Sequence, residues 1–150
     1  MASTLACVYY HVIFSTKDRY PFIDDALRTR LHGYIGAIIS GERGVPVAVG
    51  GTADHVHVLF AMRTTPSVAA MVNKIKSNSS KWVHETGPAK TKFAWQSGYG
   101  VFSVSVSNVD EVKAYVMSQE AHHRKRTFQE EYLAFLTKHN VDYDEKYLWT

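Results

Sequence analysis

The stretch of residues 54–60, Asp-His-Val-His-Val-Leu-Phe, decides the fold because it joins strand-forming residues to two histidines at alternate positions. Val, Leu and Phe favour β-structure, and neither Gly nor Pro interrupts the stretch, so it predicts a strand. Side chains alternate between the two faces of a strand, so His55 and His57 are expected to point the same way. Two neighbouring imidazoles can bind one metal ion, while the hydrophobic residue between them packs in the core.

The segments on either side of this strand predict an alternation of strands and helices. Apolar residues at three- and four-residue spacing indicate helices, and the alternation of apolar residues with Ser103 and Ser105 indicates a half-buried strand. Strands are expected at residues 6–15, 45–50, 54–62 and 101–106, and helices at residues 25–40, 66–86, 108–125 and 128–139. The order βαββαβ with extra C-terminal helices predicts an α+β fold, a ferredoxin-like sheet with helices on one face. That fold hosts many functions and does not decide the activity.

Length and composition predict a single domain over residues 1–150, with 45% hydrophobic and 21% charged residues. No apolar run approaches the roughly 20 residues of a membrane span, and the first residues lack the pattern of a signal peptide. The one cysteine, Cys7, excludes an intrachain disulfide and is expected to be buried. A cytoplasmic protein without a membrane partner is therefore expected.

Positive charge is distributed unevenly, although the net charge is only +3. Residues 63–92 contain six basic residues against the single acid Glu85, and a second basic run covers residues 124–126. Such surfaces attract phosphate backbones, and the alternative is an ordinary solvated helix face. The six basic residues are Arg63, Lys74, Lys76, Lys81, Lys90 and Lys92.

A second half of the site is expected on the helix at residues 108–125, where Tyr115 and Gln119 are four residues apart and share a face. The two imidazoles and the Gln119 carbonyl oxygen can bind a divalent cation, and the Tyr115 oxygen can attack phosphorus to form a phosphotyrosine. A phenol with a pKa near ~10 needs a cation or a base to help it, and the sequence does not identify that base. The alternative is a half-buried tyrosine beside a surface glutamine.

Four further residues allow two interpretations each. Asp54 either orients an imidazole or caps a turn, and the turn is favoured because a strand would point it away from His55. His122 and His123 could be ligands or phosphate contacts, but a surface position at a helix end is favoured. His11, on the first predicted strand, is expected in the core and not as a ligand.

Four motifs, in the same order along nearly the whole chain, carry a family resemblance. They are Gly-Gly-Thr-Ala-Asp-His-Val-His-Val-Leu-Phe at 50–60, Tyr-His-Val-Ile-Phe-Ser-Thr-Lys-Asp-Arg-Tyr-Pro at 10–21, Ala-Trp-Gln-Ser-Gly-Tyr-Gly-Val-Phe-Ser-Val-Ser at 94–105, and Tyr-Val-Met-Ser-Gln-Glu-Ala-His-His at 115–123. Together they resemble the single-tyrosine transposases that move insertion sequences as single-stranded DNA, the TnpA type of HUH endonuclease.

This resemblance implies a site and a reaction. His55, His57 and Gln119 match the family's ligands for a divalent metal, Mg²⁺ or Mn²⁺, and Tyr115 matches its nucleophile. Members cleave single-stranded DNA at the element ends, hold the 5′ end as phosphotyrosine and release a 3′ hydroxyl that can reseal the strand. They work as homodimers, in which the tyrosine helix often completes the partner's site, and they recognise DNA hairpins.

No motif identifies the residues that would bind a hairpin. The basic predicted helix at residues 66–86 and the residue after the histidine strand offer the DNA contacts, namely Arg63, Lys74 and Lys81. Two alternatives remain at this point. One is a domesticated relative that processes palindromes by the same chemistry, and the other is a non-catalytic nucleic-acid-binding module of ferredoxin-like fold. Whether Tyr115 would act in its own subunit or across the dimer stays open.

Overall fold

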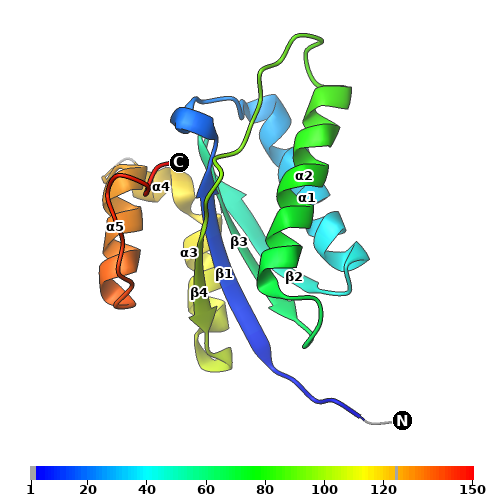
Figure 1. Cartoon of the computed structure of the whole chain (residues 1–150), viewed down its shortest axis with the longest axis vertical. Helices are drawn as coiled ribbons and strands as arrows, with labels where there is room; N and C mark the ends of the chain where they lie inside the picture. The colour runs from blue at the N-terminus through cyan, green and yellow to red at the C-terminus, as the bar shows by residue number, and fades with distance from the viewer. Residues whose placement is uncertain (1–2, 124) are drawn as a thin grey trace.

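A four-stranded antiparallel sheet forms the centre of the computed structural model, which describes residues 3–123 and 125–150 (Figure 1). The strand order is β2-β3-β1-β4, so the two strands richest in β-forming residues occupy the middle. Its strands are β1 (Val8–Ser15), β2 (Val45–Gly51), β3 (His55–Met62) and β4 (Gly100–Val104). In the β1–β3 register, Ser15 lies opposite His55 and Ile13 lies opposite His57.

Two helices, α1 (Asp25–Gly41) and α2 (Val68–Thr86), cover one face of the sheet. Side-chain caps begin both, because Asp24 accepts from the Leu27 N–H at 2.8 Å and Ser67 accepts from the Ala70 N–H at 3.1 Å. Their buried faces pack on the side of β1 and β3 that carries Phe14. The ferredoxin-like α+β prediction, with both helices of the βαββαβ unit on one face, is confirmed.

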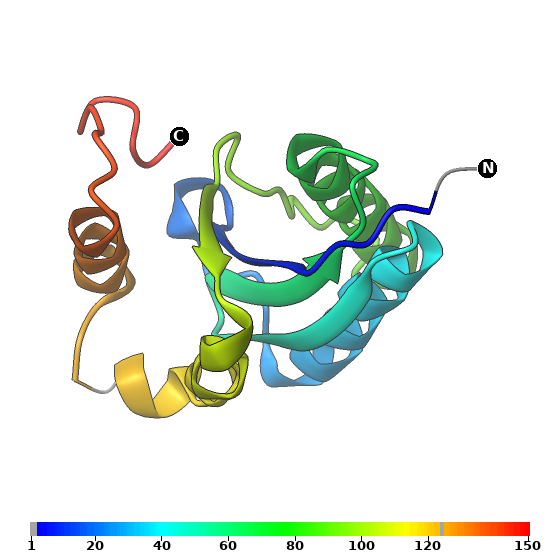
Figure 2. The ribbon, with the colours of Figure 1, turned by 90° about the horizontal axis from the view of Figure 1, so that it is seen from below.

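The C-terminal helices lie on the other face of the sheet (Figure 2). The two histidines of β3 also point to this face, where they contact Gln119 and Glu131. They are α3 (Val109–Met117), α4 (Gln119–His123) and α5 (Phe128–Lys138). Helix α5 begins at a capping box of Thr127 and Glu130 and packs on Ile13 and Phe102.

The prediction of one continuous helix over residues 108–125 was wrong. The helix breaks at Ser118, whose hydroxyl donates to the Ala114 carbonyl at 2.9 Å, a local bond that competes with helical pairing. The Gln119 amide nevertheless donates to the Tyr115 carbonyl at 3.1 Å, so both residues remain on one side. Arg124, in the second basic run, lies outside the described residues.

Helix α3 approaches β2 so closely that a side chain at Gly50 could not be accommodated. A Cβ built there would lie 1.9 Å from the Val116 carbonyl oxygen. Val116 itself is fully buried against Ala48 and Leu59. Glycine at position 50 therefore allows the turn of α3 that carries Tyr115 to pack directly on the backbone of β2.

Two smaller expectations have different outcomes. Cys7 is exposed, contrary to the predicted burial, because it precedes the first residue of β1, where residues 3–8 are all exposed. Among the helices that the described residues form, none has the length and apolar character that crossing a bilayer requires.

Candidate metal and nucleophile site

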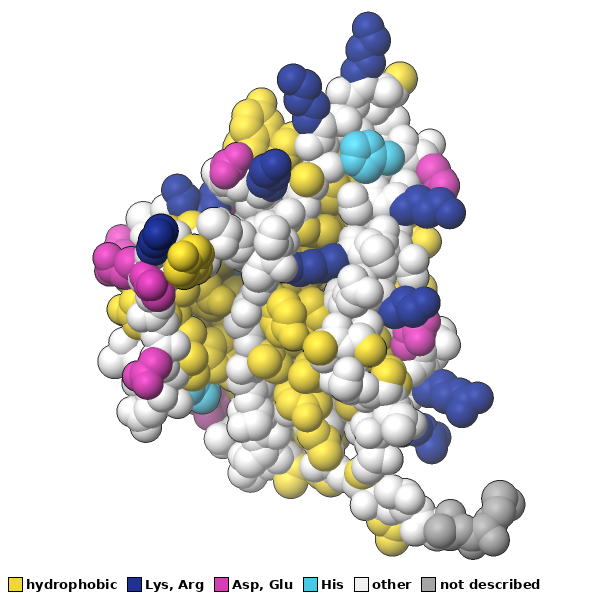
Figure 3. All heavy atoms as spheres, viewed as in Figure 1, with side chains coloured by type: hydrophobic (Ala, Val, Ile, Leu, Met, Phe, Trp, Pro, Cys, Tyr) yellow, Lys and Arg dark blue, Asp and Glu magenta, His cyan; other side chains and the backbone are white. Residues whose placement is uncertain are grey.

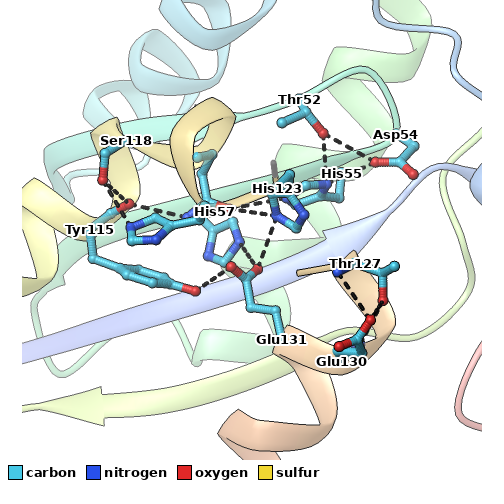
Figure 4. A network of polar contacts seen from close by, with 12 residues as sticks. Thr52, Asp54, His55, His57, Tyr115, Ser118, His123, Thr127, Glu130 and Glu131 are labelled. Carbon is cyan, nitrogen blue, oxygen red and sulfur yellow. Dashed lines mark hydrogen bonds and ion pairs between the residues drawn. The ribbon is translucent and has the colours of Figure 1, made fainter. Parts of the chain in front are cut away.

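His55 and His57 lie at the beginning of β3 with their rings on one face, as the alternation of the strand predicts. Both are fully buried, and their ring centroids are 5.3 Å apart. Close neighbours come from three separate segments. One is β1, and the other two are the broken helix at Ser118 and α5 (Figure 4). The pair is therefore enclosed by the C-terminal helices and is not open to solvent.

The orientation of His55 is set by the segment that precedes the strand. Its Nδ1 lies 2.8 Å from Asp54 Oδ1 and 3.1 Å from Thr52 Oγ1. Burial would raise the pKa of Asp54, but its hydrogen bond to His55 lowers that pKa below the ordinary value, so it is a carboxylate. A carboxylate only accepts, so the Nδ1 hydrogen of His55 points to Asp54 and Nε2 is directed into the site. The turn role favoured for Asp54 was wrong.

His57 is held between two buried groups. Its Nδ1 lies 2.8 Å from His11 Nε2, and its own Nε2 lies 2.9 Å from Glu131 Oε1. Burial lowers the pKa of His57 to about 4, although the contact with Glu131 opposes that effect. The ring is therefore neutral at neutral pH, as a metal ligand must be. His11 is in the core as predicted, where it also fixes the ring of His57.

Glu131 is the residue that sequence reasoning missed. It comes from α5, is 1% exposed, and contacts His57, His123 at 3.5 Å and the hydroxyl of Tyr115. Burial would raise its pKa, but hydrogen bonds from His123, His57 and Tyr115 lower that pKa well below the ordinary value. Its spacing gave one signal, because an acid three residues after Phe128 lies on the apolar stripe of a helix.

Tyr115, on α3, lies beside the histidine pair of its own chain. Its hydroxyl donates to Glu131 Oε2, and its ring centroid is 5.7 Å from that of His57 (Figure 4). Burial raises the pKa of the phenol, and the hydrogen bond and negative charge of Glu131 raise it further. The phenol therefore keeps its proton at neutral pH in this arrangement.

Gln119 is 2% exposed and points its carbonyl oxygen at the histidines. That oxygen lies 3.2 Å from His55 Nε2 and 3.1 Å from His123 Nε2. When the ring hydrogen of His55 is on Nδ1, the lone pair of Nε2 faces the lone pairs of the Gln119 oxygen. Two facing acceptors need a cation or a proton between them. His123 is half-buried within this group, so the surface position favoured for it was wrong.

The donor set fits a divalent metal ion. One ligand atom each from His55, His57 and Glu131 lie within 4.8 Å of one another. An octahedral ion with ligand bonds of ~2.1 Å places adjacent ligands about 3 Å apart, close to the 2.9 Å between His57 and Glu131 and the 3.2 Å between His55 and Gln119. The carboxylate and amide oxygens of this set are donors that Mg²⁺ and Mn²⁺ take, and its imidazole nitrogens are donors for transition metals.

The residues predicted to contact DNA lie away from this group. Lys74 and Lys81 are exposed on α2, and Arg63 is exposed just after β3. Because His55 begins β3 and Arg63 follows its last residue, the two are separated by the length of the strand, roughly 25 Å. Basic side chains are visible over α2 and the loop that follows it, whereas acidic ones gather over α5 (Figure 3).

The family comparison agrees with this geometry. Residues 4–119 match the family described as Transposase IS200 like. The chain belongs to the IS200-like transposase family. The matched segment includes His55, His57, Tyr115 and Gln119 but ends before α5, so Glu131 lies outside the part shared with the family profile. The family resemblance drawn from the four motifs is confirmed.

Solved structures support the fold of this IS200-like transposase. A candidate transposase from Deinococcus radiodurans R1 has 21% sequence identity and a TM-score of 0.62, and the match covers 77% of this chain and 93% of that one. A REP-associated tyrosine transposase bound to a REP hairpin has 11% identity and a TM-score of 0.55, covering 77% of this chain and 70% of that one. A search of the curated proteins gave no significant match.

Proposed function

We propose that this IS200-like transposase cleaves and rejoins single-stranded DNA through a phosphotyrosine at Tyr115, with a divalent metal, Mg²⁺ or Mn²⁺, bound by His55 and His57. The observation that carries the proposal is the position of the Tyr115 hydroxyl, which shares the Glu131 carboxylate with His57. A nucleophile and a set of metal ligands thus meet within one chain. Residues 1–150 act as one catalytic domain in this proposal.

The reaction is an exchange of phosphodiester bonds. The Tyr115 oxygen attacks phosphorus, the bond from phosphorus to the 3′ oxygen breaks, and the 5′ end stays on the tyrosine. The phenolic proton leaves as the oxygen bonds to phosphorus, and the departing 3′ oxygen takes up one proton to become a hydroxyl. Attack by a 3′ hydroxyl on the phosphotyrosine reverses these steps, so no nucleotide is consumed. A bound divalent cation supplies positive charge that stabilises both the phenolate and the phosphate oxygens.

The residues around the nucleophile orient it and its ligands. Glu131 holds the Tyr115 hydroxyl beside His57, and Gln119 offers a further oxygen ligand. Asp54 and His11 occupy the Nδ1 atoms of the two histidines, which leaves both Nε2 atoms facing the site. Each of the two histidine rings therefore has a polar partner that keeps it in place.

DNA hairpins are the expected substrate. The structure of a REP-associated tyrosine transposase bound to a REP hairpin, which shares the fold, supports this part of the proposal. The exposed basic residues Arg63, Lys74 and Lys81 are the proposed contacts with its phosphates. The homodimer stays a prediction, and we propose that each subunit uses its own Tyr115.

The test is incubation of the protein with a labelled single-stranded element end that contains a hairpin, in Mg²⁺ or Mn²⁺. We expect a protein–DNA adduct that survives denaturation and is lost in EDTA and in Tyr115→Phe. His57→Ala should abolish cleavage but leave hairpin binding nearly intact. An adduct that persists in Tyr115→Phe would contradict the assigned nucleophile, and hairpin binding without any adduct would favour the non-catalytic module.

A further inference from the structure

A hollow of about 700 Å³ lies at the end of the sheet where β1 ends and the histidine strand begins. Two segments distant in the sequence form it, the chain after β1 and the loop after α2, and they run close together at that end of the sheet (Figure 1). We name it the Tyr20 hollow, and its main lining residues are Lys17, Asp18, Tyr20, Phe22, Lys90 and Lys92.

An aromatic platform forms one wall of the Tyr20 hollow. The Tyr20 side chain is 61% exposed, and its ring centroid is 4.5 Å from that of Phe22. Phe22 in turn packs edge-on against the buried Phe93 at 5.6 Å. The exposed ring is therefore supported from below by the core, so one of its faces can receive a flat partner.

The other groups of the hollow carry mostly positive charge. Lys17 comes from the segment after β1, and Lys90 and Lys92 come from the loop after α2. All three are exposed, and Asp18 is the one acid among the lining residues. A supported aromatic ring between lysines is the arrangement that binds an unpaired nucleotide, through base stacking and phosphate contacts.

The Tyr20 hollow adjoins the proposed catalytic site through the backbone. The Thr16 N–H donates to the Asp54 carbonyl at 2.8 Å, and the Ile23 N–H donates to the Ala53 carbonyl at 2.9 Å. Ser15 lies opposite His55, and Lys17 follows Ser15 by two positions. The Cα atoms of Lys17 and His55 are therefore about 8 Å apart. Phe22 and Phe93 pack in the core on the α1–α2 face of the sheet, whereas the histidines point to the other face. A DNA strand that leaves the histidine site would therefore pass around this end of the sheet to reach the hollow.

We propose that the Tyr20 hollow is a binding site for unpaired nucleotides of the DNA strand next to the cleaved phosphate, with one base stacked on Tyr20. The assignment to single-stranded DNA follows from the chemistry, because the bases of a duplex are stacked on one another and do not present a free face to a protein ring. The inference rests on the proposed function, which identifies single-stranded DNA as the substrate, but it concerns binding and not cleavage.

The test measures binding in a Tyr115→Phe background, where no adduct can form. The probes are a short fluorescein-labelled oligothymidylate and a duplex of the same length, titrated by fluorescence anisotropy. Tyr20→Leu should weaken oligothymidylate binding about 10-fold, the scale of one lost base stack, while Tyr20→Phe keeps the stack and the affinity. Tyr147→Leu is the matched control, because its side chain is 62% exposed outside the hollow, and it should change nothing.

The lysines give a second, independent measurement. Replacing Lys17, Lys90 and Lys92 together by Gln should lower the slope of log affinity against log salt for oligothymidylate by about 2, since each single-strand phosphate contact contributes about 0.7. Equal weakening of both probes in Tyr20→Leu, or no weakening at all, would overturn the assignment. If instead the Tyr20 effect holds but Tyr115 forms no adduct with labelled DNA, the hollow stands and the proposed cleavage fails.

Discussion

Replacing Glu131 by Gln tests the role of the carboxylate that α5 brings into the site. The change keeps the size of the side chain but removes its charge and one of its two acceptor oxygens. In the protein that carboxylate meets three groups, namely His57 at 2.9 Å, His123 at 3.5 Å and the hydroxyl of Tyr115. An amide offers one oxygen and one NH₂ group, so at least one buried donor loses its acceptor.

The expected loss follows from that arithmetic. A buried donor without an acceptor costs about 1–3 kcal/mol, and the lost charge weakens the bonds that remain, so the free energy of unfolding should fall by about 3 kcal/mol. For a chain of 150 residues this corresponds to a Tm lower by roughly 6–12 °C. Glu85→Gln is the control, because that side chain is 61% exposed and its contact with Lys81 is 3.9 Å long.

Metal binding gives the same experiment a second readout. Mn²⁺ at about 100 times its Kd should stabilise the wild-type protein by about 2.7 kcal/mol. If Glu131→Gln weakens Mn²⁺ binding 100-fold, the same concentration adds only about 0.4 kcal/mol by that relation. Thermal unfolding with and without Mn²⁺ measures both quantities. A variant that unfolds like the wild type and keeps the full Mn²⁺ shift would refute the assignment of Glu131 to the site.

Three further outcomes are expected. Mixing His57→Ala with Tyr115→Phe should give no adduct if each subunit uses its own tyrosine, whereas a dimer that exchanges its tyrosine helices would recover activity. In EDTA, the denaturant midpoint should decrease as the pH is lowered from 6.5 to 4. The pKa of His57 is about 6.5 in the unfolded chain and about 4 in the folded chain, so protonation favours unfolding over this range by about 3 kcal/mol. A His57→Gln variant should lack this decrease. Lys76→Met should lower the free energy of unfolding by about 2 kcal/mol, because the Lys76 ammonium donates to the carbonyls of Gln96 and Ser97 at 2.9 and 3.2 Å. Lys74→Met is the control for this comparison, because Lys74 is exposed.

Local signals explain which parts of the fold were predictable. The two-residue alternation of strands and the three- and four-residue spacing of apolar residues in helices are properties of short segments, so they can be read from the chain alone. The start of α2 was predicted two residues early, because Ser67 caps the helix and Val68 begins it. The break at Ser118 was not foreseen, because a serine hydroxyl in a helix can either face solvent or donate to a carbonyl one turn earlier, as Ser118 does to Ala114. The exposure of Cys7 likewise depends on where β1 begins.

The site divides in the same way. His55 and His57, with Tyr115 and Gln119, are motifs with fixed spacing, and the structure brings all four together. Asp54 was misjudged because the alternation of a strand was applied to a residue that precedes the strand.

Glu131 could not be assigned from its neighbours in the sequence. Its place depends on how α5 packs against the sheet, which is a tertiary property. Phe128 and Tyr132 on the same helix bury themselves beside Ile13 and Phe102, and that packing turns the carboxylate toward the histidines.

The proposed requirement for a cation agrees with the charges around Tyr115. The Tyr115 hydroxyl donates a hydrogen bond to the Glu131 carboxylate, whose pKa is lowered. The pKa of Tyr115 is raised, so the phenol has little tendency to ionise. A DNA phosphate that approached the same hydroxyl would bring a second negative charge beside Glu131. Two anions and a developing phenolate cannot share a buried site at reasonable energy unless positive charge lies among them. The neutral imidazole of His57 provides no such charge, but together with His55 it can bind a cation. We therefore expect removal of the metal to stop cleavage even though the proposed catalytic side chains stay in place.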